Sequence, residues 1–447
     1  MQTNVGLIEL LQSALDGVRQ LHNNPPEEIQ RWITEGTIPA NIPLPDGNVA
    51  LVTVDGYRAI VKFADNIWQN NPTLKQTVDA KSFLRVTLDC FGEMLPELLE
   101  VDNVTKESIK NLRNRIFSKL KEKQLPVTHY FPCWLFRDPQ VTKFNIGSIE
   151  FMQLNNWLLK VEQASKMHQK WIHEVQEYWQ GKRVSDALED EASKVVVSAV
   201  DNCFWIAAVR IEKHEEKKSY ERARFAVRLA LDALGLIIKP SQVKNLQLKA
   251  EANPPSAIRK LSQPDGHNLY YGADFNSSGI GESANQLLET NSDFLRAAGQ
   301  LIETIVSLES GRNTRKLDER WLNALYWYGE ACREPTDFIA LVKLGVSLDI
   351  LTKGEKRGIC KFTCKLFGKK DSDPITRDGT TLKQIVEDLY SEGRSQIAHG
   401  SKLGILEDYS FSRQRSSFFV RDVLREAIVR LSTYQGEDEL EGFINSL

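Results

Sequence analysis

The sequence predicts a mainly α protein, α+β overall, that ends in an all-α helical bundle. Three observations support this. Apolar residues recur at helical spacing in separate segments, of which the first is 7–21 and the last is 416–433. Stretches rich in aromatic and β-branched residues, broken by Pro and Gly, interrupt this pattern near 128–151. Four helical segments follow one another in the last third of the chain. We expect three regions: a mostly helical 1–190 with short strands, an α+β 191–312, and a helical bundle over 313–447.

Composition sets limits on the class of protein. The 447 residues are 41% hydrophobic and 26% charged, which is typical of a globular protein. The net charge of −3 gives no global basic excess, so any nucleic-acid site must be local. The chain start lacks a secretory pattern, and the longest apolar run, 229–238, is too short to cross a membrane and contains Asp232. We therefore expect a cytoplasmic protein with no membrane partner.

Cysteine and histidine spacing argues against a metal or a disulfide framework. Six cysteines are scattered along the chain, which favours reduced thiols. Cys360 and Cys364 lie one helical turn apart but have no second pair of ligands nearby. His168 and His173 share no face with a suitably spaced carboxylate. We expect no metal and no cofactor.

The N-terminal region alternates helices and short extended segments. Residues 7–21 carry a broad apolar stripe that ends at an Asn-Asn-Pro-Pro sequence. Segments 50–54 and 58–63 flank Asp55-Gly56, which suits a short hairpin. Residues 101–124 predict a charged amphipathic helix. Its basic side chains are more simply explained as a face exposed to solvent than as a face that contacts phosphate.

The middle of the chain mixes both element types. We expect strands at 128–136 and 144–151 joined by a turn, a helix over 154–178 and a strand at 194–200. Residues 207–236 contain a strong helix closed by Gly235. Residues 240–281 predict either a loop-rich β segment or an excursion between domains, and 283–308 is helical again. A sensing or regulatory role would suit the region upstream of the bundle.

The predicted bundle has helices at 317–333, 337–351, 381–392 and 416–433, the third capped by Thr380 or Thr381. Between the last two lies a short polar segment with Arg394 and His399. An imidazole can move a proton near neutral pH, and a guanidinium grips phosphate. On an ideal helix, positions five apart differ by about 140°. The pair therefore needs a helix end, or a second subunit, to form one site.

A basic segment, 353–370, precedes this motif. It has seven basic residues against one acid, Glu355, with Phe362 and Phe367 between them. Such a mixture suits single-stranded nucleic acid, and a solvated insertion is the alternative. The candidate RNA-binding residues are Lys353, Lys356, Arg357, Lys361, Lys365, Lys369 and Lys370.

The pattern Tyr390-x3-Arg394-Ser395-x3-His399, after a helix ending at 345–351, resembles the HEPN superfamily, especially its Apea-like branch. The resemblance covers about residues 315–435. It implies an all-α bundle that dimerises, with Arg394 and His399 as the catalytic motif residues and Tyr390 and Ser395 beside them. Asp349 lies where the family often has an acidic residue, usually Glu. Ser395 stands where many catalytic members carry Asn, Asp or His.

The resemblance implies a metal-independent endoribonuclease that cleaves RNA through attack by the 2′-hydroxyl. Expected partners are an RNA substrate, a second copy of the chain through the C-terminal bundle, and a regulatory protein or antitoxin. The expected role is that of an effector in prokaryotic antiviral defence or in a toxin–antitoxin type of stress response. The alternative is a non-catalytic RNA-binding, nucleotide-binding or dimerisation protein with an inactive bundle. No Gly-rich phosphate loop or nucleophile elbow indicates another enzyme class upstream.

Overall fold

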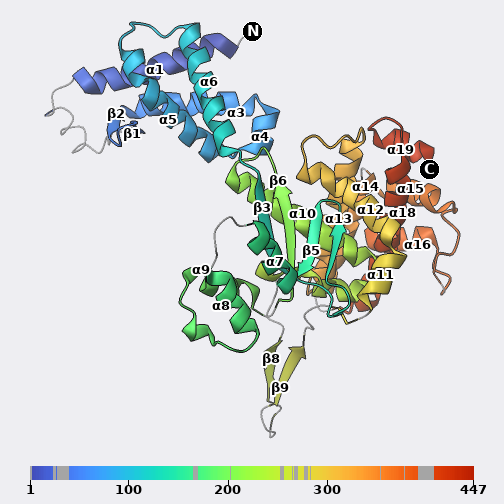
Figure 1. Ribbon diagram of the computed structural model, residues 1–447. Coiled ribbons are helices and arrows are strands. Elements are labelled where there is room, and N and C mark those ends of the chain that lie inside the picture. Colours follow the sequence, from blue (N-terminus) through green and yellow to red (C-terminus); the bar gives the residue numbers. More distant parts are fainter. Residues whose placement is uncertain are drawn as a thin grey trace. The chain divides into compact units, whose positions relative to one another are not determined.

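The fold is mostly helical with short strands, as predicted (Figure 1). The computed structural model describes residues 3–23, 27, 40–164, 170–201, 203–251, 256–263, 265, 270–275, 280–281, 283–352, 354–376, 378–390 and 407–447. The chain packs as two compact units, one of Met1–Val127 with Ile211–Arg222 and one of Thr128–Arg210 with Ala223–Leu447. The boundaries expected near 190 and 312 both fall inside the second unit, and the three-region division stays a prediction.

The first unit is built from helices around a single apolar core. Its elements are α1 (Thr3–Asn23), β1 (Ala40–Pro43), β2 (Val49–Val52), α3 (Val54–Gln69), α4 (Pro72–Thr77), α5 (Ala80–Leu99) and α6 (Lys106–Lys123). Helices α1 and α3 approach closely, because a Cβ on Gly17 would lie only 2.9 Å from the Gly56 Cα. The charged helix predicted at 101–124 is confirmed as α6.

The hairpin predicted around Asp55-Gly56 is wrong. Strand β2 pairs with β1 instead, and α3 begins directly after Thr53. The Thr53 hydroxyl caps this helix by accepting from the Gly56 backbone N–H at 3.2 Å. Ala59, Ile60 and Phe63 then face the core at helical spacing. Gly56 serves the helix contact and not a turn.

The second unit contains a five-stranded sheet in the order β4-β5-β6-β3-β7. Its strands are β3 (Val127–Trp134), β4 (Lys143–Ile146), β5 (Ile149–Gln153), β6 (Trp205–Ile211) and β7 (Gln247–Leu248). Both predicted strand regions are confirmed. The tight turn, however, lies at Gly147, with φ +58, and joins β4 to β5. Strand β3 therefore neighbours β6 and β7 and is not joined to β4 by that turn.

Three helices pack together beside this sheet: α7 (Leu154–Ala164), α8 (Lys170–Trp179) and α9 (Glu191–Val200). Trp157, Ile172 and Val197 from these helices share an apolar cluster with Met152 and Ile206 of the sheet. The strand predicted at 194–200 is wrong, because Asp190 caps a helix that buries Val197 and Val200. The ambiguous 240–281 region contains an antiparallel hairpin, β8 (Ser256–Ser262) and β9 (Tyr270–Phe275).

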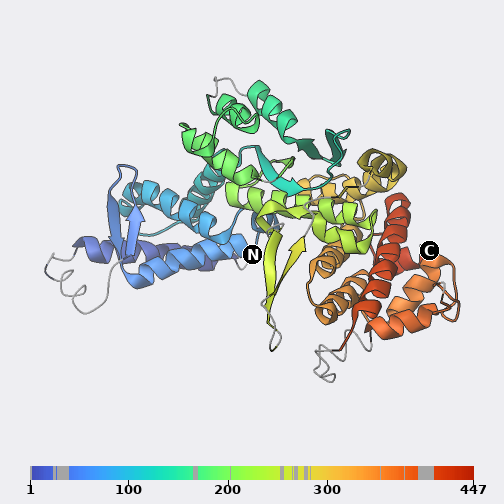
Figure 2. The ribbon, with the colours of Figure 1, turned by 90° about the horizontal axis from the view of Figure 1, so that it is seen from below.

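The bundle helices predicted at 317–333, 337–351 and 416–433 are confirmed, and the one predicted at 381–392 is helical over 382–390, since 391 and 392 lie outside the described residues. Helix α13 packs against α14 and α18, and α12 packs against α18. Figure 2 shows α18, in red, beside the orange helices of the bundle. The helices of this part are α10 (Glu216–Leu236), α11 (Ala284–Thr290), α12 (Ser292–Val306), α13 (Arg315–Arg333), α14 (Asp337–Thr352), α15 (Lys356–Phe367), α16 (Leu382–Glu387), α18 (Ser410–Thr433) and α19 (Leu440–Ser446).

Local signals set the limits of two of these helices. The predicted Thr381 cap is confirmed as part of a capping box with Gln384, whose side chain accepts from the Thr381 N–H at 2.9 Å. Helix α16 ends at Glu387 and a wider, π-helical turn follows at 388–390. Helix α10 ends at Leu236, one residue after Gly235. Within the described ranges, no helix has the length and apolarity needed to span a membrane.

A buried histidine makes the stability of the first unit depend on pH. His214 is 1% exposed, and its Nδ1 donates to the Glu212 carbonyl at 2.6 Å. Burial lowers the His214 pKa from its ordinary value, and nearby Arg222 lowers it further. The unfolded chain therefore takes up a proton below about pH 6.5 that the folded chain does not.

We expect the contribution of His214 to the free energy of unfolding to be complete above about pH 6.5. As the pH drops toward 5, this contribution should fall by at most about 1.4 kcal/mol per pH unit. Denaturant unfolding followed by circular dichroism at pH 7, 6 and 5 measures this slope. His214→Gln should flatten it. An equal slope in wild type and His214→Gln would contradict the prediction.

Candidate functional site

The central residues of the predicted site, Arg394, Ser395 and His399, lie outside the described residues, as does Lys353. The structure therefore describes the segments that precede and follow the motif in the chain. Helix α16 and its wide turn precede it, and α18 follows it. Both flanking helices belong to the second unit.

The two supporting residues that the structure describes lie in this same bundle. Asp349 is half-buried in the last turns of α14, and its backbone carbonyl accepts from the Gly354 N–H at 2.8 Å. Gly354 has φ +80, a conformation that favours glycine and turns the chain from α14 toward α15. Tyr390 is half-buried at the end of the wide turn after α16. The motif is thus preceded in the chain by residues held in packed helices.

The basic segment is mainly a helix of the bundle, so its description as a solvated insertion is wrong. Helix α15 buries Ile359, Phe362 and Leu366 on one face. Phe362 is fully buried, with its ring centroid 6.4 Å from that of Phe443, and Phe367 lies at the same distance from Phe419. These two rings stabilise the bundle core, and Phe362 cannot stack on a base.

The cations of this segment divide into two groups. Lys356 pairs with Glu387, the Lys365 Nζ donates to the Ile444 carbonyl at 2.9 Å, and the Lys369 Nζ donates to the Pro374 carbonyl at 3.2 Å. Arg357 and Lys361 are exposed and four residues apart on α15, and Lys370 is exposed just beyond its end. Among the described residues of the segment, Arg357, Lys361 and Lys370 therefore present their charge to solvent, and the exposed Lys369 also keeps its charge, because a carbonyl does not neutralise it.

A second cationic surface is a cleft of about 590 Å³ at the start of α18, lined by more basic than acidic side chains. The end of α13 and the short 3₁₀ helix Pro240–Asn245 (η2) form its other sides. Arg413 joins these walls, because its guanidinium pairs with Asp337 at 2.8 Å and donates to the Ala331 carbonyl at 3.0 Å. A cation at a helix C-terminus satisfies carbonyls that have no partner within the helix.

Two lysines of this cleft remain uncompensated. Lys239 and Lys244 are exposed and form no ion pair or side-chain hydrogen bond with the rest of the described chain. The acids that line the cleft are already engaged: Glu334 with Lys343 at 2.7 Å, and Asp337 with Arg413. An anion entering the cleft would therefore meet free positive charge.

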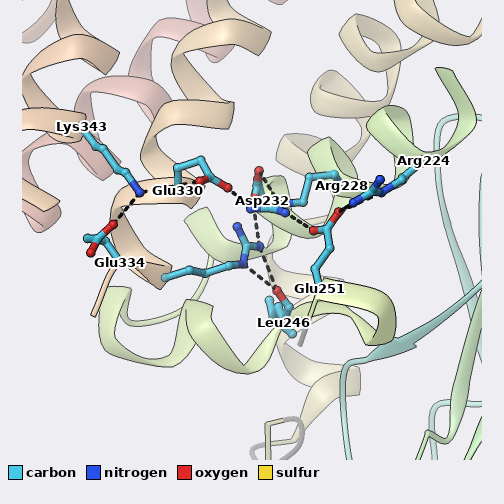
Figure 3. A network of polar contacts seen from close by, with 9 residues as sticks. Arg224, Arg228, Asp232, Leu246, Glu251, Glu330, Glu334 and Lys343 are labelled. Carbon is cyan, nitrogen blue, oxygen red and sulfur yellow. Dashed lines mark hydrogen bonds and ion pairs between the residues drawn. The ribbon is translucent and has the colours of Figure 1, made fainter. Parts of the chain in front are cut away.

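A network of buried charges lies behind the cleft (Figure 3). The Asp232 carboxylate of α10 is fully buried, 2.6 Å from the Arg333 guanidinium of α13 and 3.7 Å from that of Arg228. Arg228 also pairs with Glu251 and with Glu330 of α13. Arg333 lines the cleft and donates to the Leu246 carbonyl at 2.9 Å. The network connects α10, α13 and the segment that leads out of the sheet.

Burial raises the pKa of Asp232 above its ordinary value, while the guanidinium groups of Arg333 and Arg228 oppose that shift. Burial alone would lower the pKa of Arg228, but the carboxylates of Asp232, Glu251 and Glu330 raise it. Each buried charge thus depends on partners from other elements. This network was not expected from the sequence. Its signal was the i,i+4 pair Arg228 and Asp232 inside an otherwise apolar helix.

Gly329 allows α13 to approach this network, because a Cβ at that position would overlap the Asp232 carboxylate. We expect Gly329→Ala to destabilise the second unit by about 1–3 kcal/mol, since overpacking displaces a group held by two buried partners. Gly358→Ala, in α15, is the matched control. Its Cβ would make an ordinary 3.4 Å contact, so stability should stay equal or rise slightly. Thermal unfolding of both variants measures the difference, and equal melting temperatures would refute this role for Gly329.

No family model, curated protein or solved structure matches this chain. Across the described ranges, no group of three or more His, Cys, Asp or Glu side chains is arranged to hold a metal ion.

Proposed function

We propose that the protein is a metal-independent endoribonuclease of the HEPN type. The observation that carries this proposal is the order of elements in the bundle. The Arg394-x4-His399 motif follows α16 and precedes α18 in the chain, and both helices belong to one compact unit. Asp349 and Tyr390, the supporting residues that the structure describes, lie in helical turns of the same unit.

The chemistry follows from the residue types. The His399 imidazole removes the proton of a ribose 2′-hydroxyl or protonates the departing 5′-oxygen. The Arg394 guanidinium stabilises the charge that develops on the phosphorus centre. The 2′-oxygen forms the new bond to phosphorus and the bond to the 5′-oxygen breaks. The products are a 2′,3′-cyclic phosphate and a 5′-hydroxyl, and DNA is not a substrate because it lacks the 2′-hydroxyl.

The cleft at the start of α18 supports this proposal with an electrostatic argument. RNA carries one negative charge per nucleotide, and lysines without partners provide the charge that binds a backbone. Lys239 and Lys244 are such lysines. The cleft that they line is also lined by the first residues of α18, which follow the motif closely in the chain. We infer that an RNA strand bound at the motif passes through this cleft.

Dimerisation through the bundle would unite two copies of the motif, since residues five apart do not share one helix face. The proposed biological role is that of an RNase effector in antiviral defence or in a toxin–antitoxin type of stress response, restrained by a regulatory protein or antitoxin. An inactive bundle that only binds RNA or nucleotide is the competing outcome of the tests below.

The first test measures cleavage of a labelled RNA by the purified full-length protein in the presence of EDTA. We expect cleavage with cyclic-phosphate ends, and a loss of about 10²–10⁴-fold in rate for His399→Ala, the range of general acid–base catalysis. Arg394→Ala should lose a similar factor, whereas His173→Ala, which changes an exposed imidazole, should retain wild-type activity. Equal cleavage by wild type and His399→Ala would refute the proposal. Tight RNA binding without cleavage would favour the competing outcome.

The second test measures RNA binding at the cleft. In the His399→Ala background, a 2′-O-methyl oligonucleotide, which cannot be cleaved by this chemistry, is titrated at several salt concentrations. We expect Lys239→Glu/Lys244→Glu to weaken binding at least tenfold and to reduce the slope of log affinity against log salt by about 1–2. Lys121→Glu/Lys123→Glu, on the exposed end of α6, is the matched control and should bind as the background protein does. Unchanged binding by the cleft variant would show that RNA does not use the cleft.

A further inference from the structure

A second pocket, of about 790 Å³, lies at one end of the inner strands β5, β6 and β3 of the sheet in the second unit. Its residues come from the chain just after β3, from the junction of β5 and α7, from the C-terminal ends of α8 and α9, and from the residues before β6. The volume is within the roughly 300–1,000 Å³ of small-molecule sites. None of its lining residues belongs to the cationic cleft.

Aromatic rings dominate the walls of this pocket. Phe204 is 64% exposed although it directly precedes a buried strand. Tyr178 and Trp179, at the end of α8, are half-buried and also line the pocket. Phe136, the fourth aromatic residue of the lining, is 2% exposed, and its carbonyl accepts from the Trp205 Nε1 at 2.7 Å. Phe204 thus provides an exposed ring in a pocket whose other aromatic residues are held in the fold.

The polar groups of the pocket are few and nearly neutral in sum. The Asn155 side chain is exposed and makes no hydrogen bond to the rest of the described chain. The Gln153 Nε2 donates to the Val141 carbonyl at 2.9 Å, which leaves its side-chain oxygen as an acceptor. One cation, Arg137, and one anion, Asp201, also line the pocket. Burial raises the pKa of the Cys203 thiol to about 11, so this group stays uncharged near pH 7.

These properties define the ligand. Aromatic walls favour a flat, apolar face, and amide groups favour an edge with hydrogen-bond donors and acceptors. The balance of one cation and one anion favours a group without net charge, in contrast to the lysine-lined cleft. A nucleobase has all three properties, and proteins commonly bind one by stacking on an aromatic ring and hydrogen bonding to its edge.

We propose that this pocket binds a nucleobase, carried either by a free nucleoside or nucleotide or by an unpaired position of an RNA strand. Phe204 provides the stacking surface and Asn155 contacts the base edge. The site is independent of the ribonuclease proposal, because it shares no residue with the motif or the cleft. If the ribonuclease proposal and the pocket proposal are both correct, the region upstream of the bundle uses this pocket to sense a nucleotide or to hold part of the RNA substrate.

The test uses the full-length protein with Lys239→Glu/Lys244→Glu and His399→Ala, so that phosphate binding at the cleft and cleavage do not interfere. Adenosine, guanosine, cytidine and uridine are titrated separately, followed by saturation-transfer NMR and tryptophan fluorescence. A second arm uses a single-stranded RNA trinucleotide. We expect saturable binding of at least one probe, weakened at least tenfold by Phe204→Ala. Asn155→Ala should change the preference among bases.

Phe411→Ala is the matched control, because Phe411 is also a 64% exposed phenylalanine of the second unit. It should bind like the background protein. Binding of nucleosides that depends on Phe204 identifies a free nucleoside or nucleotide as the ligand, and binding of the trinucleotide alone identifies RNA. The proposal is overturned if no probe binds at millimolar concentration, or if Phe204→Ala and Phe411→Ala bind equally well. Circular dichroism checks that each variant is folded.

Discussion

The second unit depends on one buried carboxylate, that of Asp232. Removing a carboxylate from water costs several kcal/mol. Helix α10, which carries Asp232, is therefore stable in this position only if positively charged groups pair with that carboxylate. Arg228 supplies one from the same helix, and Arg333 supplies the other from α13. The close approach at Gly329 gives this charge pair room. The contact thereby fixes the register of α10 against the first helix of the C-terminal bundle.

The same contact positions residues of the cationic cleft. Arg333 belongs to the charge network and also lines the cationic cleft. Arg413 then ties the first turn of α18 to the end of α13, because its guanidinium donates to the Ala331 and Glu334 carbonyls. Lys239 and Lys244 keep their charge free because the acids nearby are already paired. A rigid frame with a few uncompensated cations is the arrangement that a polyanion requires.

Two surfaces of this unit differ in chemistry. The cleft has excess positive charge, which suits a phosphate backbone, whereas the pocket at the strand ends is aromatic and nearly neutral, which suits a base. Together they could bind the two parts of a nucleotide chain by different forces, one that weakens with salt and one that does not. The salt dependence of each variant therefore separates their contributions to binding.

The sequence alone determined the helices of the bundle, the strands near 128–151 and the Thr381 cap, because apolar periodicity and capping residues act locally. It also predicted a site at Arg394 and His399, from residue type and from the position of the pair between two bundle helices. Tertiary structure decided what Gly56 does, since a glycine suits a turn and a close helix contact equally well. It decided that 194–200 is a helix, where the packing of Val197 and Val200 overrides β-branched propensity. It alone revealed the partners of Asp232, the burial of Phe362 and the free charge of Lys239 and Lys244, because these depend on residues distant in the chain.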